Sequence, residues 1–221
     1  MGSHVLIGKT VTIMEGYGGG SGAYIPDTGE LTPEQLAELE KELAEMGIDY
    51  TSDASLSDFL SKFYFNQKGI QDASGLSGLC NFSSYMMLAA YYSNKGFTTN
   101  ELAALAKKWC RSDGLFTNQG SCMSQYGFSV SGDVRGFNNI VSSIKSGIDS
   151  GNPLILHCRG YWGDYHTTSN GHFMVVTGYD NNGIKVADPG KRANNSRTIP
   201  WSAVETGTQT NDVYVRTSTK A

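Results

Sequence analysis

The feature that most constrains this chain is a single cysteine placed directly before a long apolar segment. The stretch from Gly75 to Leu79 is rich in glycine and serine, and Cys80 follows it at once. From Tyr85 to Tyr92 every side chain is apolar or aromatic. A helix that is apolar nearly all round is a buried helix. The sequence therefore predicts a central buried helix with Cys80 at its start.

The predicted position of Cys80 suits an anion. The free backbone N–H groups and the positive end of the dipole at a helix N-terminus favour negative charge. A thiol in that place has a lowered pKa and carries more thiolate. A buried structural cysteine is the alternative, because free cysteine packs as a small hydrophobe. The position alone leaves both interpretations open.

A second informative stretch lies far downstream and has the pattern of a strand, a turn and a strand. His172 opens an apolar run, residues 180–183 have hairpin turn chemistry, and the second strand ends at Asp188. A cysteine on a helix, a histidine on a strand and an acid after the next strand are the nucleophile, base and orienting group of a Cys–His–Asp triad. A two-residue turn leaves Asp188 out of register with His172, so we expect a bulge or extra twist in the hairpin.

Other histidines and cysteines offer weaker candidates. His157 and Cys158 end a predicted core strand over residues 154–158, and we interpret them as packed core residues, with a second Cys–His pair as the alternative. His166 stands in a polar loop before His172 and is expected to be solvated or at the edge of a cleft. A zinc site from Cys158, His166 and His172 is conceivable, since imidazole and thiolate suit zinc, but the irregular spacing disfavours it.

Several motifs together resemble a known family. They are FYFNQ before the cysteine, GLCNFSSYMMLA around it, GNPLILHC as a core strand, and GHFMVVTGYD followed by VADPG. In this order they resemble the papain-like cysteine peptidases of the bacteriocin-processing (double-glycine leader) type and their bacterial peptidase-like relatives. The resemblance covers roughly residues 63–190. It places the family's Cys, His and Asp at Cys80, His172 and Asp188.

The resemblance implies an α+β, papain-like fold in which the central helix packs on an antiparallel sheet. We expect residues 61–221 to form this peptidase domain. Residues 1–60 would be an accessory segment with a strand over residues 5–14, a Gly-rich loop and helices, one of them over residues 32–46. That segment would pack on the core, with a propeptide or a linker as the alternative.

The activity that the resemblance implies is hydrolysis of peptide bonds without a cofactor or metal. The substrates would be peptides of the bacterial cell wall or Gly-rich leader peptides. Asn81 and Phe82 follow the cysteine, where the family usually has Gly or Glu and then a small residue. A peptide-binding pseudo-peptidase therefore stays open as an alternative. A transglutaminase-type acyl transferase, which uses the same triad, is another.

A peptidase also needs a neutral donor for the oxyanion, and a Gln amide is suited to this task. Gln67 ends the FYFNQ motif, and Gln71 lies nearer to the cysteine. We favour Gln67, because we expect Gln71 to lie in a small, flexible loop with no apolar anchor.

Composition excludes some partners. The net charge of −4 and the pI near 5.5 argue against nucleic-acid binding, which usually shows a basic footprint. No apolar run approaches the ~20 residues of a membrane span. Only 17% of residues are charged, while 27 are glycine, a composition typical of secreted bacterial proteins. We therefore expect a monomer that is extracellular or associated with the cell wall.

The remaining patterns predict further local structure. Thr98 and Glu101 form a capping box before a helix that reaches Trp109. Residues 137–148 have the pattern of an amphipathic helix, residues 198–201 that of a turn, and residues 213–217 that of an edge strand.

The four cysteines match no zinc pattern, since no C-x-x-C occurs. Cys110 and Cys122 enclose a polar, Gly-rich loop. We expect these two to form a disulfide under oxidising conditions, with Cys80 left free.

Overall fold

A computed structural model describes residues 4–7, 10–13, 62–162, 165–166, 170–190, 196–210 and 213–221 of the chain. Near the N-terminus, strands β1 (His4–Ile7) and β2 (Thr10–Ile13) pair antiparallel, where one continuous strand is expected. The predicted Gly-rich loop and the helix over residues 32–46 lie outside the described residues. The boundary at residue 60 therefore stays a prediction.

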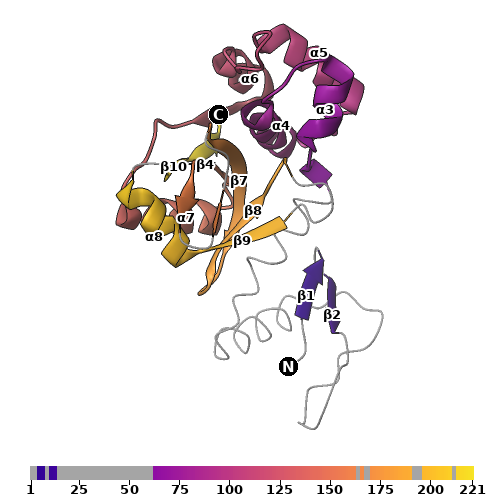
Figure 1. The fold of residues 1–221 in the computed structure, drawn as a ribbon. Coiled ribbons are helices and arrows are strands. Elements are labelled where there is room, and N and C mark those ends of the chain that lie inside the picture. The colour runs from indigo at the N-terminus through magenta and orange to yellow at the C-terminus, as the bar shows by residue number, and fades with distance from the viewer. Residues whose placement is uncertain are drawn as a thin grey trace.

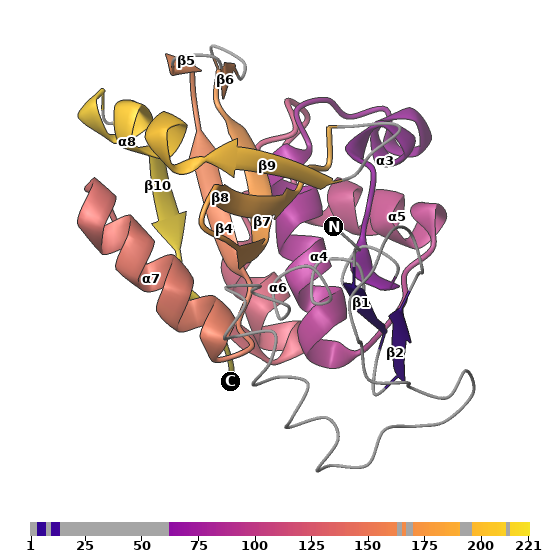
Figure 2. The same ribbon diagram turned by 90° about the horizontal axis from the view of Figure 1, so that it is seen from below.

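The rest of the described chain is built in layers around one antiparallel sheet of five strands (Figures 1 and 2). The strand order is β10–β4–β7–β8–β9. The strands are β4 (Leu154–Cys158), β7 (His172–Tyr179), β8 (Gly183–Ala187), β9 (Ser196–Pro200) and β10 (Val213–Arg216). Two smaller pairs join β3 (Phe128–Val130) to β11 (Ser218–Lys220) and β5 (Tyr161–Trp162) to β6 (Tyr165–His166).

Helices cover both faces of the sheet. On one face lies α4 (Cys80–Ser93), which is covered in turn by α3 (Gln67–Ser74), α5 (Thr99–Trp109) and α6 (Gln119–Tyr126). On the other face lie α7 (Phe137–Asp149) and α8 (Trp201–Gln209). This arrangement confirms the predicted α+β fold with a central helix on an antiparallel sheet.

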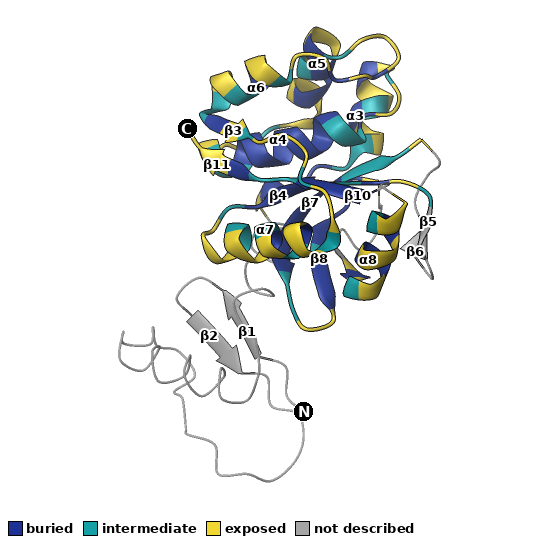
Figure 3. Ribbon diagram, turned by 90° about the vertical axis from the view of Figure 1, so that its left-hand side faces the viewer, coloured by how far each residue is buried: buried dark blue, intermediate teal, exposed yellow. Residues whose placement is uncertain are grey.

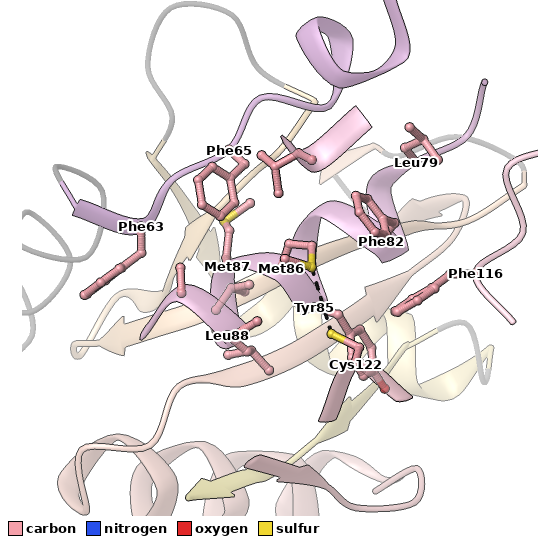
Figure 4. Close-up of a cluster of buried hydrophobic side chains, with 14 of the residues drawn as sticks. Phe63, Phe65, Leu79, Phe82, Tyr85, Met86, Met87, Leu88, Phe116 and Cys122 are labelled. Carbon is pink, nitrogen blue, oxygen red and sulfur yellow. Dashed lines mark hydrogen bonds between the residues drawn. The ribbon is translucent and has the colours of Figure 1, made fainter. Parts of the chain in front are cut away.

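The central helix is buried because it lies between the sheet and the other helices, as Figure 3 shows. Every side chain from Phe82 to Ala90 is buried. The apolar ones belong to a cluster that includes Ile155 and Val175 of the sheet, and Figure 4 shows the part of this cluster around Met86 and Met87. Burying one large apolar side chain stabilises a fold by roughly 1.5–3 kcal/mol. The helix ends at Asn94, which adopts the left-handed conformation that closes many helices.

The strands of the sheet carry apolar residues on both faces because helices cover each face. Ile155 and Val175 face α4, whereas Leu156 and Met174 belong to a second core cluster with α7 and α8. Alternate residues of a strand point to opposite faces, so two cores require apolar residues at nearly every position. This explains why LILHC and FMVV show no polar alternation.

The hairpin of β7 and β8 carries the predicted bulge. The N–H of Asp180 donates to the carbonyl oxygen of Gly183 at 2.9 Å, which closes the turn. The pairing register then shifts between Val176 and Gly178. Without the shift Asp188 would lie opposite Val175, whereas with it Ala187 takes that place. The bulge thus moves Asp188 one position closer to the start of β7.

Several local predictions are confirmed. Thr98 and Glu101 form the reciprocal capping box of α5. Helix α7 begins at Phe137, and β10 is an edge strand of the main sheet. Among the helices of the described part of the chain, none is long and apolar enough to cross a membrane.

Two predictions about local structure are wrong. The turn expected over residues 198–201 is the end of β9 and the start of α8, which has no side-chain cap to announce it. Gln71 lies in α3 and not in a loop. Asn66 caps that helix by accepting from the N–H of Lys68 at 2.8 Å, and Gly75 ends it in the left-handed conformation.

The disulfide expected between Cys110 and Cys122 is absent, and all four cysteines are free. Helix α6 turns Cys122 into the core, where its sulfur contacts that of Met86 on α4 at 3.9 Å (Figure 4). Cys110 ends α5 and pairs with Phe116 across an isolated β-bridge. The backbone of Cys110 and the thiol of Cys122 thus have different neighbours.

Candidate active site

Cys80 occupies the first position of α4, and backbone packing fixes the approach to it. Gly114 (φ +84°) lies so close to the preceding segment that a Cβ atom there would be 1.5 Å from the carbonyl oxygen of Ser77. Gly78 also has a positive φ, of 66°. Both positions favour glycine, and at Gly114 the contact with Ser77 leaves no room for a side chain. The loop after α5 thus supports the residues that lead into the cysteine.

His172 and Asp188 meet at the open ends of β7 and β8. His172 Nε2 lies 2.7 Å from Asp188 Oδ1, and the side chains are 13% and 3% exposed. The N–H of Gly190 donates to the same oxygen at 2.8 Å. A Cβ atom on Gly190 would lie 3.2 Å from both Asp188 Oδ1 and His172 Cε1, so a glycine lets the chain cover the pair closely.

The thiol of Cys80 completes this group from the helical side. Burial alone would raise the pKa of this thiol. The hydrogen bond with His172, the charge of His172 and the backbone N–H groups of Phe173 and Asn81 act against burial, and together they lower the pKa. Burial likewise disfavours protonated His172, yet its hydrogen bonds with Asp188 and Cys80 raise its pKa to about 9. Both shifts favour a thiolate beside an imidazolium.

Gln67 lies at the first position of α3, and its backbone contacts the turn after Asp188. Its backbone N–H donates to the carbonyl oxygen of Pro189 at 2.9 Å, next to Asp188. Its side-chain Oε1 is buried without a hydrogen-bond partner. An amide oxygen only accepts hydrogen bonds, so this unpaired atom could pair with a donor of a ligand but not with an oxyanion. The role of Gln67 as oxyanion donor stays a prediction. Gln71 lies one turn further along α3 and is half-buried.

His157 and Cys158 are packed side chains, as the core interpretation predicts. The His157 ring lies between those of Phe173 and Tyr214, with centroids 4.7 and 4.6 Å away. Burial and the charge of Arg216 lower its pKa to about 4, so it is neutral at pH 7. Cys158 is buried, and its sulfur lies 3.7 Å from the carbonyl oxygen of His172.

The side chain of His166 lies outside the described residues. Among the side chains that are described, no group of three or more His, Cys, Asp or Glu could hold a metal ion.

Sequence reasoning missed three residues that shape this site. Gly114 belongs to an Asp-Gly turn far from Cys80 in the chain, and nothing local links the two. Gly190 follows Asp188-Pro189, a signal that we used only to end the strand. Tyr64 lies inside the FYFNQ motif, and its hydroxyl donates to the carbonyl oxygen of Asp188 at 3.1 Å.

Comparison with known proteins agrees with the predicted resemblance. Residues 60–221 match the Peptidase_C39 like family, and the chain belongs to that family. Membership supports a hydrolase function of the cysteine peptidase class.

Two solved structures are similar to this chain. One is a C39-like peptidase candidate from Bacillus anthracis, 15% identical, with a TM-score of 0.47 over 66% of this chain and 90% of that chain. The other is a double glycine motif protease from an AMS/PCAT transporter in complex with the leader peptide, 17% identical, with a TM-score of 0.38 over 63% and 84%. A search of curated proteins finds no match.

The lowered pKa of Cys80 predicts selective alkylation. Near neutral pH, iodoacetamide should modify Cys80 faster than Cys110, which is similarly half-buried but whose pKa burial raises to about 12. Cys122 and Cys158, both fully buried, should react slowest. Mass spectrometry of partly labelled protein measures the order. Preferential labelling of Cys110 or Cys158 would contradict the assignment.

Proposed function

We propose that this protein is a cysteine peptidase in which Cys80 is the nucleophile, His172 the general base and acid, and Asp188 the group that orients the imidazole. The observation that carries the proposal is the placement of His172 between a buried acid 2.7 Å away and the thiol at the start of α4. The pKa shifts of Cys80 and His172 in opposite directions support a preformed ion pair.

The reaction follows from these positions. The thiol proton passes to His172, and the thiolate attacks the carbonyl carbon of a peptide bond. The backbone N–H of Cys80 and the side-chain amide of Gln67 donate to the developing oxyanion. Collapse of the tetrahedral intermediate breaks the C–N bond, and His172 gives its proton to the leaving amine. Water, deprotonated by His172, then hydrolyses the thioester and releases the acid.

We infer peptides of bacterial cell walls or Gly-rich leader peptides as substrates, and an extracellular or wall-associated monomer as the acting form. Family membership and the weakly charged, Gly-rich composition support this inference. Phe82 packs in the core against Phe116, with ring centroids 5.5 Å apart. Its departure from the family pattern is therefore a matter of core packing, which supports an active enzyme over a pseudo-peptidase.

The test is an assay of the wild type and Cys80→Ala on Gly-Gly peptides and on whole peptidoglycan, with and without an added amine. The wild type should release new amino termini, whereas folded Cys80→Ala should release none. If the wild type binds peptide and cleaves none, the protein is a pseudo-peptidase. If it joins the added amine to the acyl group in preference to water, it is an acyl transferase.

We expect the activity to be limited to a pH range that is set by the ionisation of Cys80 and of His172. Activity should fall at acid pH as the Cys80 thiolate is protonated, and at alkaline pH as the imidazolium is lost near its pKa of about 9. Because the Asp188 hydrogen bond raises that pKa, Asp188→Asn should move the alkaline limb to lower pH and reduce the maximum. Measuring kcat/KM from about pH 5 to about pH 10 tests this. An alkaline limb that does not move would show that Asp188 does not set the pKa of His172.

Substitutions can distinguish Gln67 from Gln71, which lies one turn further along α3, as the donor to the oxyanion. Gln67→Ala should lower kcat by ~10²–10³ with little effect on folding, the usual cost of losing one oxyanion donor. Gln71→Ala serves as the matched control and should leave kcat unchanged. If Gln71→Ala is the damaging substitution instead, the donor has been assigned to the wrong glutamine.

A further inference from the structure

The segment from Tyr64 to Gln67, which leads into α3, is bonded to the main chain at the acid of the site. The hydroxyl of Tyr64 donates to the carbonyl oxygen of Asp188 at 3.1 Å, and the N–H of Gln67 donates to that of Pro189 at 2.9 Å. Two consecutive carbonyl groups of one turn are thus bonded to one short segment. The first of these contacts joins residues that are 124 positions apart in the chain.

These contacts hold the turn at a point that lies beyond the end of the sheet. Strand β8 ends at Ala187, so the ladder with β7 and β9 stops one residue before Asp188. From there the side-chain oxygen of Asp188 is bonded to His172 and to the N–H of Gly190. Its main-chain carbonyl is bonded to Tyr64.

Tyr64 itself is firmly placed. Its neighbours Phe63 and Phe65 are both buried in the core around α4 (Figure 4). Phe63 packs edge-on against Tyr91 and Phe65 against Phe97, with centroids 5.6 and 6.0 Å apart. Tyr64 is half-buried and packs against the same cluster, and its hydroxyl reaches the turn. The two anchored phenylalanines on either side thus fix the chain at the tyrosine.

We propose that Tyr64 is a positioning residue that couples the helical layer to the acid of the site. It holds the main chain of Asp188 so that the carboxylate stays within hydrogen-bond distance of His172. Because the same segment carries Gln67, the oxyanion donor and the acid are held as one unit. This inference rests on the proposed function, and it adds a residue that touches neither the substrate nor the reacting atoms.

The test measures the alkylation rate of Cys80 against pH, which needs no substrate. Tyr64→Phe keeps the ring and removes one hydroxyl. Loosening Asp188 weakens its support of the imidazolium, so the thiolate at about pH 6 should become scarcer. The rate should fall about three- to ten-fold there, the usual weight of one hydrogen bond, and match the wild type at about pH 10, where the thiol ionises without help.

Tyr179→Phe is the matched control, because its hydroxyl also makes one long-range bond, to Asp149 Oδ1 at 2.8 Å, on the opposite face of the sheet. It should leave the pH profile unchanged even if both variants lower the Tm equally. A Tyr64→Phe profile that superimposes on this control overturns the coupling and leaves the proposed peptidase intact. A wild-type Cys80 that shows no excess reactivity at about pH 6 overturns both.

Discussion

The structure depends on the burial of α4 between the sheet and the outer helices. This helix has no polar face, so its only stable place is inside the domain, and both its ends are thereby fixed against the surrounding elements. Its packing on β7 brings the start of the helix to the start of that strand. Cys80 and His172 occupy these two positions. The hydrophobic core therefore sets the distance between the thiol and the imidazole.

Local features of the backbone place the site residues more closely. The bulge after Val176 brings Asp188 one position closer to His172, and Gly190 lets the chain fold over the pair. Gly114 supports the residues before Cys80 through a contact that tolerates no Cβ atom. Each of these features places main chain and not a side chain. The site is thus assembled from three separate segments of the chain.

The charge states of the site residues follow from their burial and from their hydrogen-bond partners. Asp188 is nearly inaccessible, and a buried carboxylate is costly unless it is hydrogen-bonded and paired. His172 and the N–H of Gly190 provide these partners. In return the acid stabilises a charged imidazole, which in turn stabilises a thiolate. His157, only one strand away, lacks such a partner, lies among arginine side chains and is neutral.

The sequence by itself determined the elements that have strong local signals. The buried helix after Cys80, the capping box at Thr98, the hairpin at residues 180–183 and the order of Cys80, His172 and Asp188 were all predictable, because composition and turn chemistry act over a few neighbouring residues. Even the bulge followed from counting positions across the hairpin. Asn66 and Gly75 cap α3 and are residue types that often cap helices, yet from the sequence we expect Gln71 in a loop, and α3 is therefore a local structure that the prediction misses.

Only the tertiary structure decided the rest. The contact of Gly114 with Ser77, the bond from Tyr64 to Asp188 and the separate burial of Cys110 and Cys122 join residues with no shared local pattern. Helix α8 forms without a capping signal because the second core covers it. Such contacts are set by how whole elements pack, and packing depends on the shape of every layer at once.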